Sequence, residues 1–145
     1  MPTLTKIDVK AIVAAVFDKV RLDARLTIIS WKKGVRSLHL QQENPVGSVY
    51  LDPTAEGTQV PWTMPDAREL GFGVGVSALW KNEDIGKAEA DRDDALADLM
   101  TLFQEQRDLG RSEVIALTSR FSVVTSEDGK WARFDGRLDV VARVF

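Results

Sequence analysis

WARFDGRLDVVARVF, residues 131–145, alternates between two kinds of side chain almost to the end of the chain. A period of two is that of a β-strand with one face in the core and the other toward solvent. The stretch therefore predicts a long antiparallel strand with a charged outer face. The predicted core face carries Ala132, Phe134, Gly136, Leu138, Val140, Ala142 and Val144, and the predicted outer face carries Arg133, Asp135, Arg137, Asp139 and Arg143.

A second alternating run, EVIALTSRFSVVT (113–125), precedes the last strand and is joined to it by SEDGK (126–130). An Asp-Gly pair between two alternating runs is a strong signal for a β-hairpin. The sequence therefore predicts that the chain ends on an antiparallel hairpin.

LGFGVGVSALW (70–80) is the third alternating run. Its bulky residues, Phe72 to Trp80, are predicted to face the core, and the other face holds little but glycine. Bare glycine on a strand often marks a close approach by another element. The helix that follows is the predicted neighbour on that glycine face.

Two amphipathic helices are predicted, over residues 6–20 and 84–109. The first has apolar residues at helical spacing, with Thr5 as N-cap and Asp8 in the manner of a capping box. The second carries acids in its first turns and stops at Gly110.

Between the first helix and the glycine-rich strand the prediction is less regular. LTIIS (26–30) and VRSLHLQ (35–41) are predicted as short strands around a turn at 31–34, forming a hairpin. Residues 43–69 hold four prolines and are predicted as a long irregular loop suited to partner binding, with SVYL (48–51) as an edge strand.

The composition places these elements in one domain, residues 1–145. The chain is 44% hydrophobic and 28% charged, as in ordinary globular proteins. It has no cysteine, which excludes disulfides and thiolate zinc sites and fits a reducing compartment. Charges interrupt the first twenty residues too often for a signal peptide or a membrane span. The predicted fold class is α+β, a mostly antiparallel sheet with two main helices packed on it.

Charge is unevenly distributed along the chain. Residues 1–42 contain eight Lys and Arg against three acids, and residues 83–98 contain seven acids against two bases. These balances of +5 and −5 fit solvated faces, a nucleic-acid patch, or the two sides of a head-to-tail contact between identical subunits.

No motif of catalysis or cofactor binding emerges. GFGVGV (71–76) lies inside a strand pattern, whereas a dinucleotide fingerprint opens a helix. Gly86-Lys87 lacks the upstream glycine of a phosphate-binding loop. His39, the one histidine, has no local partner, and a GxSxG elbow is absent. We predict no catalytic residue and no cofactor.

The acids of the second helix, Glu89, Asp91, Asp93, Asp94 and Asp98, could hold Mg²⁺, since Asp94 and Asp98 are one turn apart. Acids early in a helix are also expected from the helix dipole and for solubility. The second explanation is preferred, so no metal is predicted. A basic stripe with interleaved aromatics is missing, so sequence-specific nucleic-acid binding is not predicted either.

The order of elements resembles the tail-terminator proteins of long-tailed bacteriophages: an N-terminal helix, a variable loop, an alternating strand (72–80), a helix and a closing hairpin that ends with 131–145. The resemblance implies a virion structural protein and not an enzyme. It implies a hexameric ring that caps the tail tube and joins it to the head-side connector. The implied partners are copies of itself, tail-tube and connector proteins, with no membrane. The implied place is the tail or neck of the virion, after synthesis in the host cytoplasm.

The proline-rich segment 43–69 and the long second helix depart from that family, which leaves other head-tail joining or tail-completion roles open. The predicted interface comprises Asp91, Asp93, Asp94, Arg133, Asp135, Arg137, Asp139 and Trp62. One alternative is a non-enzymatic module that binds a small ligand or peptide through the proline-rich loop and Trp62. Another is a small Mg²⁺-dependent hydrolase that uses the acidic helix.

Overall fold

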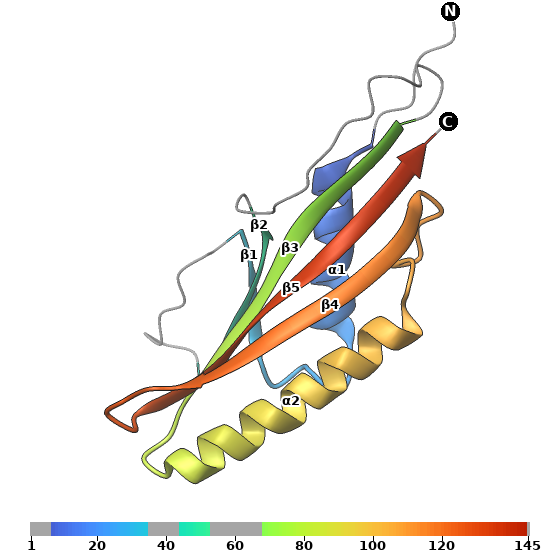
Figure 1. The fold of residues 1–145 in the computed structure, drawn as a ribbon. Helices are drawn as coiled ribbons and strands as arrows, with labels where there is room; N and C mark the ends of the chain where they lie inside the picture. The colour runs from blue at the N-terminus through green and yellow to red at the C-terminus, as the bar shows by residue number, and fades with distance from the viewer. Residues whose placement is uncertain (1–6, 35–43, 53–67, 145) are drawn as a thin grey trace, which may run out of the picture.

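The computed structural model describes residues 7–34, 44–52 and 68–144, and these form one five-stranded sheet with two helices. The strands lie in the order β1-β2-β3-β5-β4, and every pair except β1–β2 is antiparallel. Figure 1 shows β3, β5 and β4 as three long ribbons side by side, with α1 behind them. The α+β fold class is thereby confirmed. The elements are α1 (Val9–Leu22), β1 (Ser30–Lys33), β2 (Val46–Asp52), β3 (Arg68–Lys81), α2 (Ile85–Glu105), β4 (Val114–Thr125) and β5 (Trp131–Val144).

The closing hairpin is confirmed. β4 and β5 pair antiparallel over almost their whole length, and the turn between them places Gly129 at a φ of 66°. The N–H of Ser126 donates to the carbonyl oxygen of Trp131 (2.9 Å) and closes the loop. A register shift between Val114 and Ala116 makes Ile115 the extra residue of a β-bulge.

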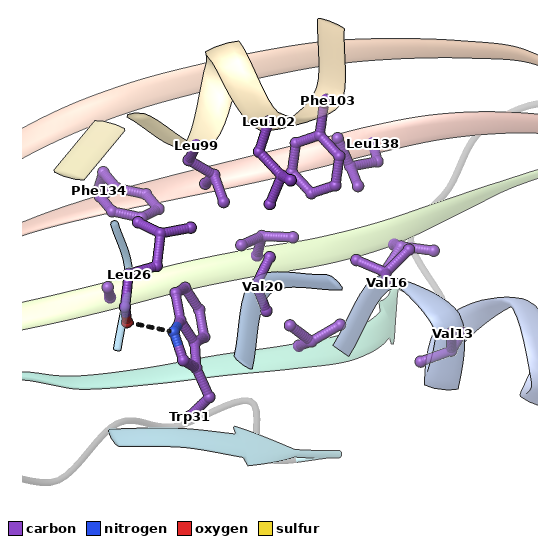
Figure 2. Packing of buried hydrophobic residues seen from close by; sticks show 14 of the residues in the cluster. Val13, Val16, Val20, Leu26, Trp31, Leu99, Leu102, Phe103, Phe134 and Leu138 are labelled. Atoms are coloured by element: carbon purple, nitrogen blue, oxygen red, sulfur yellow. Dashed lines mark hydrogen bonds between the residues drawn. The ribbon is translucent and has the colours of Figure 1, made fainter. Parts of the chain in front are cut away.

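The core lies on one face of the sheet, as the alternation predicts. On β3 and β5 the buried row includes Val74, Val76, Phe134 and Leu138, all without exposed surface. Both helices pack on this face: α1 contributes Val16 and Val20, and α2 contributes Leu99, Leu102 and Phe103 (Figure 2).

The predicted packing of α2 on the glycine face is wrong. The helix packs on the bulky face of β3, where it buries more apolar surface. The glycine face is covered instead by the Tyr50 ring from β2. A Cβ added to Gly75 would lie 2.3 Å from Cζ of Tyr50, so glycine is required by this close approach.

Both helices begin one turn or less from their predicted starts. In α1 the N-cap is Asp8, whose Oδ1 accepts from the N–H of Ala11 (3.0 Å), so the predicted N-cap Thr5 is wrong. In α2 the N-cap is Asp84, and the helix ends at Glu105, four residues before the predicted end. Leu109 and Gly110 then turn the chain with positive φ angles toward β4.

The prediction for residues 26–34 is also wrong. Leu26 and Ile29 lie in turns and are both buried, three residues apart. The strand spans Ser30–Lys33 and so takes up all of the predicted turn except Gly34. Trp31 explains the shift, because its ring packs over Gly47 and its Nε1 donates to the carbonyl oxygen of Leu26 (3.2 Å). The predicted strand at 35–41 and His39 lie outside the described residues.

Within the proline-rich segment the structure contains a strand that was predicted only in part. β2 spans Val46–Asp52 and lies between β1 and β3, so the expectation of an edge strand at 48–51 is wrong. Its pairing with β1 is parallel, which corrects the predicted hairpin around residues 31–34. Residues 53–67, including Trp62, lie outside the described residues.

Candidate interaction surfaces

The face of the sheet opposite the helices gathers the charged residues of β5. Register pairs Asp139 with Gly73, Arg137 with Gly75 and Asp135 with Ser77. On the other side β4 places Thr118, Arg120 and Ser122 beside the same residues of β5. Arg133, Asp135, Arg137 and Asp139 thus lie together on this face, which we call the outer sheet face.

Ion pairs link most of the outer sheet face within one subunit. Asp139 forms an ion pair with Nε of Arg137 (2.8 Å) and accepts a hydrogen bond from Arg120 (2.7 Å). Asp135 accepts from Arg133 and from the hydroxyl of Ser77 (2.9 Å). The side chains of Arg133 and Arg137 are largely covered, at 28% and 22% exposure. The outer sheet face therefore carries positive and negative side chains whose positions are fixed by their ion pairs. A shallow hollow of about 350 Å³ lies over Tyr50, Arg120 and Arg137.

The acids of α2 separate into two groups that the sequence alone did not distinguish. Asp93 accepts from Nε of Arg92 (3.0 Å), which is 5% exposed. The same guanidinium donates to the carbonyl oxygen of Val124 and to the hydroxyl of Thr125, both at 3.2 Å. Asp93 and Arg92 therefore belong to the contact between α2 and the end of β4.

Asp91 and Asp94 belong to the second group. With Asp98 they line a hollow of about 190 Å³ whose other walls include Arg25, Ile28 and Trp80. Arg25 comes from the basic N-terminal third, so a basic side chain of that third borders these acids within the subunit.

Arg25 is itself held by two carboxylates. Its guanidinium donates to Asp23 (2.8 Å) and to Glu105 at the end of α2 (3.2 Å). The hydrogen bond from Arg25 holds the pKa of the Asp23 carboxyl below its usual value. The loop after α1 is thereby tied to the far end of α2.

A groove between α2 and β4 was not predicted. It has a volume of about 420 Å³ and is lined by Met100, Phe103, Gln104 and Arg107 on one side and by residues 115–119 on the other. Met100 is 43% exposed and Ile115 is 49% exposed, so two large apolar side chains beside this groove are open to solvent. In the sequence, the one indication of this groove is that α2 is only weakly amphipathic. Met100 lies outside the row of apolar residues that α2 turns toward the core.

Among the described residues no group of carboxylates and imidazoles is arranged to hold a metal ion. In the same part of the chain neither helix combines the length and apolar character needed to cross a membrane.

Comparison of the sequence with protein-family models and with curated proteins gives no match. Solved structures do match. The fold is similar to that of a chain in the virion of a native gene transfer agent (GTA) particle, with a TM-score of 0.61 and 16% sequence identity. The similarity covers 96% of this chain and 100% of the other. The two chains therefore share one whole-domain fold, from α1 to the closing hairpin.

Proposed function

We propose that this protein is a structural component of a phage-like virion, a ring-forming subunit of the tail-terminator type, and not an enzyme. The observation that carries the proposal is the fold shared over 96% of the chain with a virion chain. In this role the subunits cap the tail tube and meet the head-side connector. The order of elements supports the same role, because it resembles that of tail terminators.

The surfaces fit a protein that works by contact. A ring requires a head-to-tail interface, in which two different patches of one subunit meet on neighbouring copies. The acidic stripe of α2, Asp91 and Asp94, is one candidate patch. A basic patch lies beside β1, where the side chains of Arg21 and Lys33 both lie over the Phe17 ring, at 5.6 Å and 5.9 Å from its centroid. Arg21 also pairs with Asp18 at 2.8 Å within the subunit.

The arrangement of the helices supports this pairing of patches. α1 packs near β1 and β2, whereas α2 packs near β3, β5 and β4. The two patches therefore come from different parts of the subunit, and Asp91 and Asp94 lie on the side of α2 that borders Arg25 and Ile28. Opposite charges on two different patches favour a head-to-tail contact and oppose a two-fold one. We propose that Asp91 and Asp94 of one subunit face Arg21 and Lys33 of the next.

The first test is the native mass of the full chain at low and moderate salt, together with negative-stain images at high concentration. The proposal expects ring-shaped particles of about six subunits. A chain that stays below ring size at every salt and protein concentration would argue against self-assembly into a ring.

The second test reverses one charge at a time. Asp94→Lys and Asp91→Lys are expected to raise the concentration needed for ring formation, and the effect is expected to shrink as salt rises, because exposed charges are screened. Glu127→Lys, the same charge change in the β4–β5 turn, is the matched control. Equal effects at all three positions would show that only net charge matters.

A further inference from the structure

We propose that two copies of this protein pair through the edges of their β4 strands, forming a continuous antiparallel sheet across a two-fold axis. This contact goes beyond the proposed ring, because a two-fold contact closes after two copies whereas a ring needs a head-to-tail one. The inference comes from the direction of the β4 backbone groups, the row of side chains beside them, and the register in which β4 of one copy can pair with β4 of another.

The backbone direction follows from the hairpin. The N–H of Ser126 donates to the carbonyl oxygen of Trp131, and Ser122 pairs with Asp135 in the same register. In an antiparallel ladder only every second residue bonds to a given neighbour. Even-numbered residues of β4 therefore bond to β5, and the N–H and C=O groups of Leu117, Ser119, Phe121 and Val123 point outward.

β4 is the last strand of the sheet in the described part of the chain. Exposed edges of this length are usually protected by lysines, prolines, an inward-pointing charge or a β-bulge. The bulge of β4 lies at Ile115, near the beginning of the strand. The row of side chains on the helix side of β4, from Leu117 to Thr125, contains none of these. Val123 and Ile115 are each 49% exposed, and Ile115 borders the groove that Met100 and Phe103 line. An added strand would complete the ladder and cover these apolar groups.

The strand is complementary to itself in one register. When Ser119 of one copy lies opposite Ser119 of the other, Leu117 lies opposite Phe121, and Val123 comes level with the β-bulge at Ile115, where the regular ladder ends. The half-exposed apolar side chains of the edge then pack against one another. Val123 of the second copy enters the groove beside Ile115.

The single charge on β4 selects this register. On the outer sheet face Arg120 then lies opposite Thr118 of the second copy, next to the Asp139 that pairs with Thr118 in the sheet. Moving the register so that Arg120 faces Arg120 would place like charges directly opposite, which is destabilising. Moving the register by one residue in the other direction leaves Val123 with no residue of the second β4 strand opposite it. Of these three neighbouring registers, the one centred on Ser119 is therefore favoured.

The chain has no cysteine, so a single introduced cysteine reports the contact directly. The proposal expects Ser119→Cys to form a disulfide-linked dimer under mild oxidation, because directly opposed residues of a ladder have Cα atoms about 5.5 Å apart, within disulfide range. Ser122→Cys is the matched control and is expected to stay monomeric, because its partner across the axis is Ala116. Arg120→Cys reports the competing register. Linkage of Ser122→Cys or Arg120→Cys in preference to Ser119→Cys, or of none, overturns the proposal.

A second pair of variants tests the contact without oxidation. Ser119→Pro removes an outward N–H and leaves the ladder with β5 intact, so the dimer Kd is expected to rise on the order of tenfold or more. Ser119→Ala is expected to leave the Kd within about twofold. Far-UV circular dichroism checks that both variants are folded. Rings in Ser119→Pro together with dimer loss would support both contacts, whereas Ser119→Cys linkage without rings would remove only the proposed function.

Discussion

Arg92 lies in the first half of α2 and reaches the carbonyl oxygen of Val124 at the end of β4, 3.2 Å away. It is the charged side chain most fully buried in the described residues, and Asp93 and Glu89 balance its charge at 3.0 Å and 3.9 Å. A buried cation with hydrogen-bonded partners fixes the position of α2 relative to the hairpin. The acids around Arg92 thus have a structural role in addition to their effect on net charge.

Arg92→Met is expected to destabilise the protein by about 1–3 kcal/mol, since hydrogen bonds to charged groups contribute about that much. The methionine keeps most of the buried stem, so the loss reports the guanidinium contacts. Urea unfolding followed by circular dichroism measures the change. Arg107→Met, an exposed position just after α2, is the control and is expected to change stability by less than about 0.5 kcal/mol.

Gly75→Ala tests the packing of Tyr50 on the glycine face. The new Cβ would lie 2.3 Å from Cζ of Tyr50, so the ring must move, at an expected cost of about 1–3 kcal/mol. In a Tyr50→Ala background the same change should cost much less, because the clash is gone. Additive losses would mean that Tyr50 does not pack there. Gly86→Ala in α2 is the control, because the nearest atom to its new Cβ is Oδ1 of Asp84 at 3.3 Å, and the change in stability is expected to stay within about 1 kcal/mol in either direction.

The strands that alternate over many residues could be predicted from the sequence, and those that do not alternate could not. Phe72 to Trp80 and Ala132 to Ala142 line the core as their period requires. Leu26 and Ile29 are buried although they lie in turns. The strand-like composition of residues 26–30 therefore led to the wrong prediction of a strand there. There the indole of Trp31, packed on Gly47, overrides local propensity, and a sequence pattern does not contain that contact.

The candidate surfaces likewise divide into features that the sequence pattern predicts and features that it does not. The period of two in the sequence predicts that Arg133, Asp135, Arg137 and Asp139 share one face. It does not predict the ion pair between Asp139 and Arg120 or the packing of Tyr50 over Gly75. The pattern groups Asp91, Asp93 and Asp94 together, whereas the direction of each side chain on α2 separates Asp93 from the other two. The groove at Met100 depends on how far α2 lies from the β4 edge, which only the packed structure defines.

Ser77→Ala tests whether the outer sheet face is ordered by its buried hydroxyl. Ser77 is 1% exposed and donates to Oδ1 of Asp135 at 2.9 Å, so removing the hydroxyl is expected to cost about 1 kcal/mol. Arg133 still pairs with Asp135 in the variant, which limits the loss. Ser122→Ala is the control on the exposed side of the same row, expected within about 0.5 kcal/mol. Chemical denaturation of the three proteins in parallel gives the comparison, and equal losses would contradict the proposed role of Ser77.

The ion pair between Asp23 and Arg25 gives the protein a predictable response to acid. The hydrogen bond from Arg25 lowers the pKa of Asp23 in the folded protein below the value of about 3.9 expected in the unfolded chain. A lowered folded pKa contributes stability that is fully present above the unfolded pKa and is lost as pH falls through the folded one. Arg25 keeps its charge throughout, because both carboxylates raise its pKa.

Asp23→Asn is therefore expected to lower stability at pH 7 and to flatten the loss of stability between about pH 5 and pH 2. Urea unfolding at several pH values measures the slope, and NMR titration of the Asp23 carboxyl measures its pKa directly. Asp18→Asn, which removes a carboxylate from the exposed pair with Arg21, is the control and should change stability at pH 7 by less than about 1 kcal/mol. Parallel pH profiles for Asp23→Asn and the unaltered protein would show that Arg25 does not hold the loop after α1 through Asp23.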